Sequence, residues 1–139
     1  MPTILVPIDG SAQSEAAVEY AVAEFDPSEI TLLHVIDPIE AGYSATASVP
    51  GYSEEWYKHQ QEEAEALFEE VTGLVDGAEL RTATEVGRPS RTIVEYAEEH
   101  GVDHIVMGSH GRSGVTRILL GSVAEAVVRR SPVPVTIVR

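Results

Sequence analysis

The sequence has no cysteine, only one lysine among its 139 residues, and no long apolar run. Without cysteine the chain can form no disulfide, no thiolate metal site and no thiol nucleophile, and it fits a reducing compartment. A membrane-spanning helix needs about 18 to 20 apolar residues in succession, and no segment approaches that length. The first ten residues also lack the basic segment that begins a signal peptide. We therefore expect a cytoplasmic protein without a membrane partner.

Basic residues are scarce, with 9 Lys and Arg against 23 Asp and Glu and a formal charge of -14. Binding to a nucleic-acid backbone requires clustered basic side chains, so the composition argues against a nucleic-acid partner. The charge is unevenly distributed. Residues 1–103 contain 22 acids and 4 bases, whereas residues 104–139 contain Glu125 and five arginines. An anionic ligand would meet the least repulsion from the C-terminal quarter of the chain.

Apolar segments alternate with amphipathic segments along the whole chain, which is typical of βαβ units. The pattern predicts one domain, residues 1–139, of the α/β class. We expect three layers, with an open, twisted, parallel five-stranded sheet and helices on both of its faces. The expected strands are 3–8, 30–36, 80–86, 104–107 and 134–138, with 80–86 near an edge, and the helices run from about 11 to 25, 53 to 71, 89 to 99 and 123 to 130.

Two segments follow strands at the edge where such sheets bind ligands, the carboxyl ends of the strands. One is Pro7-Ile8-Asp9. The other, residues 108–122, has four glycines in fifteen residues and no acid. Glycines allow backbone amides to approach a ligand, and successive amides form an anion-binding nest. Ser122 and Glu125 have the spacing of a capping box, which predicts a helix start that favours phosphate. The segment is not a Walker A loop, because the lysine of that motif is missing. It is not the dinucleotide fingerprint either, because it follows the fourth expected strand and not the first.

Each of these residues also has a structural interpretation. Asp9 is as well suited to capping the first helix as to contacting a ligand. His110 lies in the glycine-rich segment without an adjacent carboxylate or nucleophile, which favours a filler or ligand-facing donor over catalysis. His34, inside an apolar strand, is expected to be a hydrogen-bonded structural residue. The five histidines lack the HExxH spacing, so we expect no metal site made by protein ligands alone.

The chain resembles the universal stress protein A family over essentially its whole length. The resemblance is carried by LVPIDGS at 5–11, LHV at 33–35, GRP at 87–89, VDHIVMGSHG at 102–111, LGSVA at 120–124 and PVPV at 132–135. The ATP-binding branch of that family is marked by G-x2-G-x9-G-[ST], which Gly108, Gly111, Gly121 and Ser122 match without a gap. The resemblance implies a Rossmann-like fold of the adenine nucleotide alpha hydrolase type, with ATP and Mg²⁺ or Mn²⁺ as cofactors.

The resemblance also implies a role for each matching residue. Asp9 would lie near the ribose and the metal of Mg-ATP, Pro7 against the nucleoside, and Val35 would offer its amide and carbonyl to adenine. The remaining residues would form the ribose and phosphate cradle and the grip at the helix start: Met107, Gly108, Ser109, His110, Gly111, Arg112, Ser113 and Gly114, then Gly121, Ser122, Val123 and Ala124.

The function implied by the resemblance is a nucleotide-dependent stress sensor or switch without efficient turnover. The C-terminal strand, residues 133–138, would pair with a second copy and form a homodimer. Two alternatives stay open: a slow ATPase or autophosphorylating protein, and a non-enzymatic, chaperone-like module with a vestigial site.

The excess of acid and the single lysine are what we expect of a protein adapted to a cytosol of high salt, where screening weakens self-repulsion. The free energy of unfolding should therefore rise as salt is added. Chemical denaturation at a series of KCl concentrations measures this, and a maximum of stability at low salt would contradict the adaptation.

Overall fold

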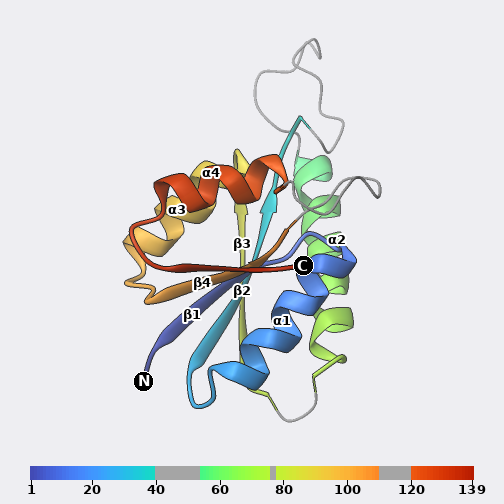
Figure 1. The fold of residues 1–139 in the computed structure, drawn as a ribbon. Coiled ribbons are helices and arrows are strands. Elements are labelled where there is room, and N and C mark those ends of the chain that lie inside the picture. The colour runs from blue at the N-terminus through green and yellow to red at the C-terminus, as the bar shows by residue number, and fades with distance from the viewer. Residues whose placement is uncertain (40–53, 76–77, 110–119) are drawn as a thin grey trace.

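Strands and helices alternate in the computed structural model, which describes residues 1–39, 54–75, 78–109 and 120–139 (Figure 1). The predicted five strands and four helices are all present in these ranges, with ends that differ by at most one residue. The elements are β1 (Thr3–Pro7), α1 (Ala12–Glu24), β2 (Glu29–Ile36), α2 (Glu54–Thr72), β3 (Leu80–Val86), α3 (Pro89–Glu99), β4 (His104–Gly108), α4 (Ser122–Arg130) and β5 (Val135–Val138).

The five strands form one parallel sheet in the order β3-β2-β1-β4-β5. In β1, Leu5 lies opposite Thr31 of β2 on one side and Ile105 of β4 on the other. The central place of β1 follows from its sequence, because Ile4, Leu5 and Val6 are all 0% exposed, as a strand covered on both faces requires. The predicted edge position of residues 80–86 is confirmed, since β3 pairs with β2 alone among the described strands and exposes several polar side chains.

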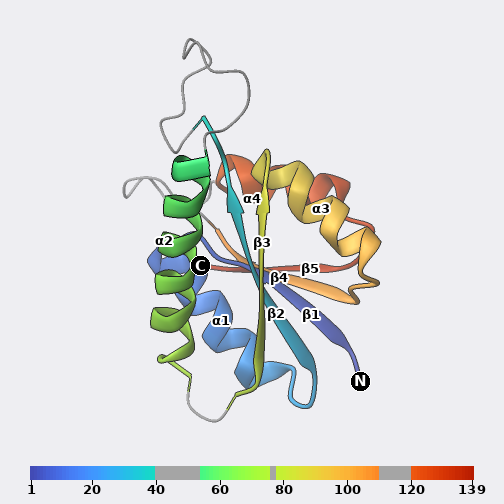
Figure 2. The ribbon, with the colours of Figure 1, turned by 180° about the vertical axis from the view of Figure 1, so that it is seen from behind.

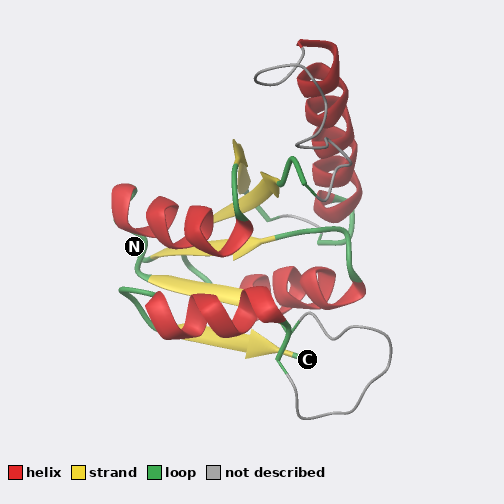
Figure 3. Cartoon of the chain, turned by 90° about the horizontal axis from the view of Figure 1, so that it is seen from above, coloured by secondary structure: helices red, strands yellow, loops and turns green. Residues whose placement is uncertain are grey.

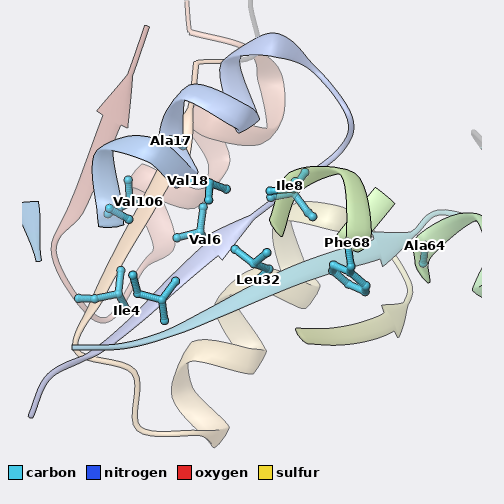
Figure 4. Close-up of a cluster of buried hydrophobic side chains, with 12 residues drawn as sticks. Ile4, Val6, Ile8, Ala17, Val18, Leu32, Ala64, Phe68 and Val106 are labelled. Carbon is cyan, nitrogen blue, oxygen red and sulfur yellow. The ribbon is translucent and has the colours of Figure 1, made fainter. Parts of the chain in front are cut away.

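Helices cover both faces of the sheet, so the predicted three-layer α/β architecture is confirmed. Figure 2 shows α1 and α2 on one side of the strands and α3 and α4 on the other, and Figure 3 shows the strands and helices from above. Side chains of β1 alternate between two cores. Ile4, Val6 and Ile8 pack with α1 and α2 (Figure 4), whereas Leu5 packs with α3 and α4. Because the strands are parallel, their carboxyl ends all lie at the same end of the sheet.

Within the described ranges, the helices are all too short or too polar to cross a membrane.

Candidate functional site

Two strand ends and two helix starts lie at the carboxyl ends of the central strands. The chain passes from β1 to β2 on one side and from β4 to β5 on the other, so the strand order reverses between β1 and β4. Each crossover helix returns antiparallel to its strands, which places its first turn at their carboxyl edge. Pro7 and Gly108 end the two strands there, and Ala12 and Ser122 begin α1 and α4. This is the place where sheets of this kind bind ligands.

The turn between β1 and α1 is held by hydrogen bonds of short range. Asp9 Oδ1 accepts from the amide of Ser11 at 2.9 Å, and Gly10 between them has φ +87°, a left-handed conformation that glycine adopts without strain. Ser11 is the N-cap of α1, because its Oγ accepts from the amide of Ser14 at 3.1 Å. The capping role considered for Asp9 is therefore wrong: Ser11 caps the helix, and Asp9 precedes it with its carboxylate at the sheet edge.

Two side chains that the sequence did not mark as site residues support this turn. Ser14 is 4% exposed, and its Oγ accepts from the amide of Asp9 at 3.4 Å. His34 Nδ1 lies 3.0 Å from the carbonyl oxygen of Ile8, so the prediction of a hydrogen-bonded structural histidine is confirmed. The serine pair at positions 11 and 14 after Asp-Gly was the available sequence signal. The partner of His34 lies 26 residues away and left no local signal.

Gly108 is required by packing between β4 and α1. A Cβ at this position would lie 2.5 Å from the carbonyl carbon of Gln13 and 2.6 Å from its oxygen. The sequence interpretation assigned the glycines of this segment to close approach by a ligand, whereas at Gly108 the atoms that approach are those of the first turn of α1. The next residue, Ser109, donates its amide to the carbonyl of Val138 at 2.8 Å. The ends of β4 and β5 are thereby fixed beside the Asp9 turn.

The first turn of α4 differs from the predicted capping box. Gly121 is the N-cap, with its carbonyl accepting from Glu125 N at 2.9 Å, so Ser122 lies one residue inside the helix and makes no cap. The Glu125 carboxylate instead pairs with Arg129 at 3.3 Å, one turn further along. The prediction of a Ser122 cap is wrong, and the correction matters chemically. Gly121 has no side chain to bond the first amides of α4, and helix geometry leaves those amides without partners inside the helix.

The remaining predicted site residues divide into core and edge positions. Met107 is 5% exposed and Ala124 is fully buried, both in the core beneath α3 and α4, and the half-buried side chains of Val35 and Val123 pack against the same core. The side chains of Met107 and Ala124 are therefore closed to a ligand, and only the backbones of these two residues can face one. The other predicted site residues lie outside the described residues: His110, Gly111, Arg112, Ser113 and Gly114.

The backbone of Val35 has a favourable direction. Leu33 O accepts from Ile8 N at 2.8 Å on the β1 side, and Ile36 O accepts from Gly87 N at 2.9 Å on the β3 side. Backbone groups alternate in direction along a strand, so the amide and carbonyl of Val35 face the β1 side. Because β1 ends opposite Leu33, both groups of Val35 extend past its end toward the site edge.

The chain is similar to known proteins in both sequence and structure. The sequence pattern of the universal stress protein family matches residues 1–139. The chain belongs to the universal stress protein family. Universal stress protein MJ0577 of Methanocaldococcus jannaschii is 34% identical to it over 98% of this chain and 93% of that protein. The solved structure of MJ0577 superposes with a TM-score of 0.81 and 37% identity, covering 99% of this chain and 94% of that chain.

A second solved member of the universal stress protein family is a complex with cAMP. It superposes with a TM-score of 0.71 and 26% identity, covering 99% of this chain and 96% of that chain. The family and its five-stranded α/β fold are thus established for this protein.

The contact between Gly108 and Gln13 yields a stability prediction. Gly108→Ala should lower the free energy of unfolding by about 1 to 3 kcal/mol, because the new methyl meets backbone atoms that can yield only if α1 shifts. Gly73→Ala is the matched control, since its Cβ would make ordinary contacts of 3.4 and 3.5 Å. Urea denaturation of both variants measures the difference, and equal stabilities would show that α1 does not pack on β4 in this way.

Proposed function

We propose that this universal stress protein binds an adenine nucleotide, ATP with Mg²⁺, at the carboxyl edge between β1 and β4, and acts as a nucleotide-dependent switch. The observation that carries the proposal is that the strand order reverses between β1 and β4, with the Asp9 turn following β1 and the glycine-capped α4 following β4 in the chain. The Asp9 carboxylate suits a metal, and the start of α4 suits phosphate. The family member solved with cAMP supports a nucleotide as the ligand class.

The phosphate groups are assigned to the first turn of α4. The amides of Ser122, Val123 and Ala124 are donors at the positive end of the helix dipole, which favours an anion. Glu125, the acid of this first turn, is paired with Arg129 and thereby partly neutralised. A polyphosphate at this helix start therefore meets amide donors, although the protein as a whole is strongly acidic.

The metal is assigned to the Asp9 side of the site. Mg²⁺ keeps several waters and is held in nucleotide sites by one or two carboxylates together with the phosphates. Asp9 supplies an exposed carboxylate there, and among the described residues no three His, Cys, Asp or Glu side chains form a metal cluster of their own. These residues fit a metal that arrives with the nucleotide, with Mn²⁺ as the alternative ion. When bound, the ion would neutralise charge between Asp9 and the phosphates.

The adenine base is assigned to the carboxyl end of β2, beside Val35. The amide and carbonyl of Val35 form a donor and acceptor pair, which complements the ring nitrogen and the amino group of adenine. Pro7, half-buried at the end of β1, would provide an apolar wall for the nucleoside. Binding by backbone groups of this kind holds the ground state as well as the transition state, so it gives affinity without rate acceleration. We therefore assign the protein a switching role with slow or no ATP turnover.

The binding test places a carboxylate at the start of α4. Ser122→Asp should leave the fold intact, because an acid in the first helical turn is favourable, yet it should weaken Mg-ATP binding at least about tenfold by repelling phosphate. Val128→Asp adds the same charge to the same helix at a position that is 45% exposed and outside the site, so its affinity should equal that of the wild type.

Isothermal titration of nucleotide-free protein measures these affinities. Absence of ATP binding by the wild type would overturn the proposed function. Equal affinities of the Ser122→Asp variant and the wild type would remove α4 from the phosphate site.

We also infer that β5 pairs with β5 of a second copy. It is the last strand of the sheet and, within the described ranges, pairs with β4 alone. Its four side chains are half-buried, and its other edge carries backbone groups suited to strand pairing. A two-fold axis beside β5 would join two sheets into one. Sedimentation velocity should then give twice the 15.0 kDa chain mass. A single chain at tens of micromolar would contradict the pairing.

A further inference from the structure

We infer that His34 and Ser14 are positioning residues of the nucleotide site, because they hold the two ends of the peptide bond that precedes Asp9. The inference rests on the proposed function, which makes Asp9 the metal-side residue. It adds that the direction of the Asp9 carboxylate is set by a histidine from β2 and a serine from α1. Neither side chain needs to touch the nucleotide for this role.

The two hydrogen bonds meet on one peptide unit. Its carbonyl, on Ile8, accepts from His34 Nδ1 at 3.0 Å, and its amide, on Asp9, donates to Ser14 Oγ at 3.4 Å. The amide of Ile8 still donates to the carbonyl of Leu33 at 2.8 Å. Thus backbone hydrogen bonds between β1 and β2 continue as far as the Ile8 amide. At the next peptide unit, the hydrogen bonds come from the side chains of His34 and Ser14.

Donor and acceptor roles in this arrangement are mutually consistent. Ser14 Oγ donates its proton to the carbonyl of Ser11 at 3.0 Å, which leaves a lone pair to accept from Asp9. The amide of Ser14 donates to Ser11 Oγ, so two reciprocal bonds fix the serine in the helix start. The carbonyl of Ile8 can only accept, and therefore His34 carries a proton on Nδ1.

The consequence for Asp9 is a fixed carboxylate on an exposed residue. With the preceding peptide held, the left-handed Gly10 returns the chain so that the Ser11 amide binds Asp9 Oδ1 at 2.9 Å. Both the backbone of Asp9 and its side-chain direction are then set before a ligand binds. Ordering a side chain in advance removes that entropic cost from binding. A donor at position 34 thus has a purpose among the apolar residues Leu32, Leu33, Val35 and Ile36.

A double-mutant cycle separates positioning from general support of the fold. His34→Leu introduces an apolar side chain of similar size and removes the donor, so Mg-ATP affinity should fall about tenfold, as it should in Asp9→Asn. The double variant should bind no more weakly than Asp9→Asn alone, because His34 acts through Asp9. His34→Asn, which returns an N–H near the Nδ1 position, should recover most of the affinity.

Amide exchange gives a readout that needs no ligand. In the wild type, NMR-detected exchange of the Asp9 amide should be slow for an exposed turn, and both Ser14→Ala and His34→Leu should accelerate it. The Ile105 amide in β4 should stay protected, which shows that the variants remain folded. Unchanged Asp9 exchange in both variants would overturn the arrangement of these bonds.

The possible failures are distinguishable. Wild-type protein without ATP affinity would overturn the proposed function, and with it the role of these residues in binding. If the wild type binds ATP but the losses of affinity from His34→Leu and Asp9→Asn add in the double variant, the positioning role alone would be overturned.

Discussion

The approach of the first turn of α1 to the end of β4 is the contact on which the rest of the site depends. It places Gln13 where any side chain at position 108 would collide with backbone, so glycine is the residue that fits. The same contact sets the turn from Asp9 to Ser14 beside the end of β4, from which the chain continues to the start of α4. A carboxylate and a set of helix amides, far apart in sequence, therefore occupy neighbouring ends of central strands. The proposed metal and phosphate positions both follow from this packing.

The fold was predictable because burial leaves a strong sequence pattern. The continuous apolar residues Ile4, Leu5 and Val6 indicate a strand covered on both faces, and the weaker alternation at 80–86 indicates an edge. The local chemistry of the site was less predictable. Asp9 and Ser11 both suit an N-cap, and packing and backbone angles decide between them. The cap of α4 moved by one residue for the same reason, from the predicted Ser122 to Gly121.

Partners that are distant in sequence explain the other differences. The sequence shows that Gly108 lacks a side chain, but the atoms that require this belong to Gln13 of another element. The bond between His34 and Ile8 likewise depends on the register of two neighbouring strands. The net charge of the whole chain likewise differs from the local charge at the site. A net charge of -14 opposes polyanions in general, whereas binding at α4 depends on local amides and on the pairing of Glu125 with Arg129.

The central claim is that one nucleotide binds where β1, β4 and the start of α4 meet. Backbone amide NMR during titration with Mg-ATP tests it most directly, because every described non-proline residue beyond the N-terminus reports on its own surroundings. We expect saturable shifts concentrated at Asp9, Gly10, Val35, Ser109 and Ser122 to Ala124, with little change along the outer face of α2. Shifts confined to other surfaces, or none at saturating ATP, would contradict it.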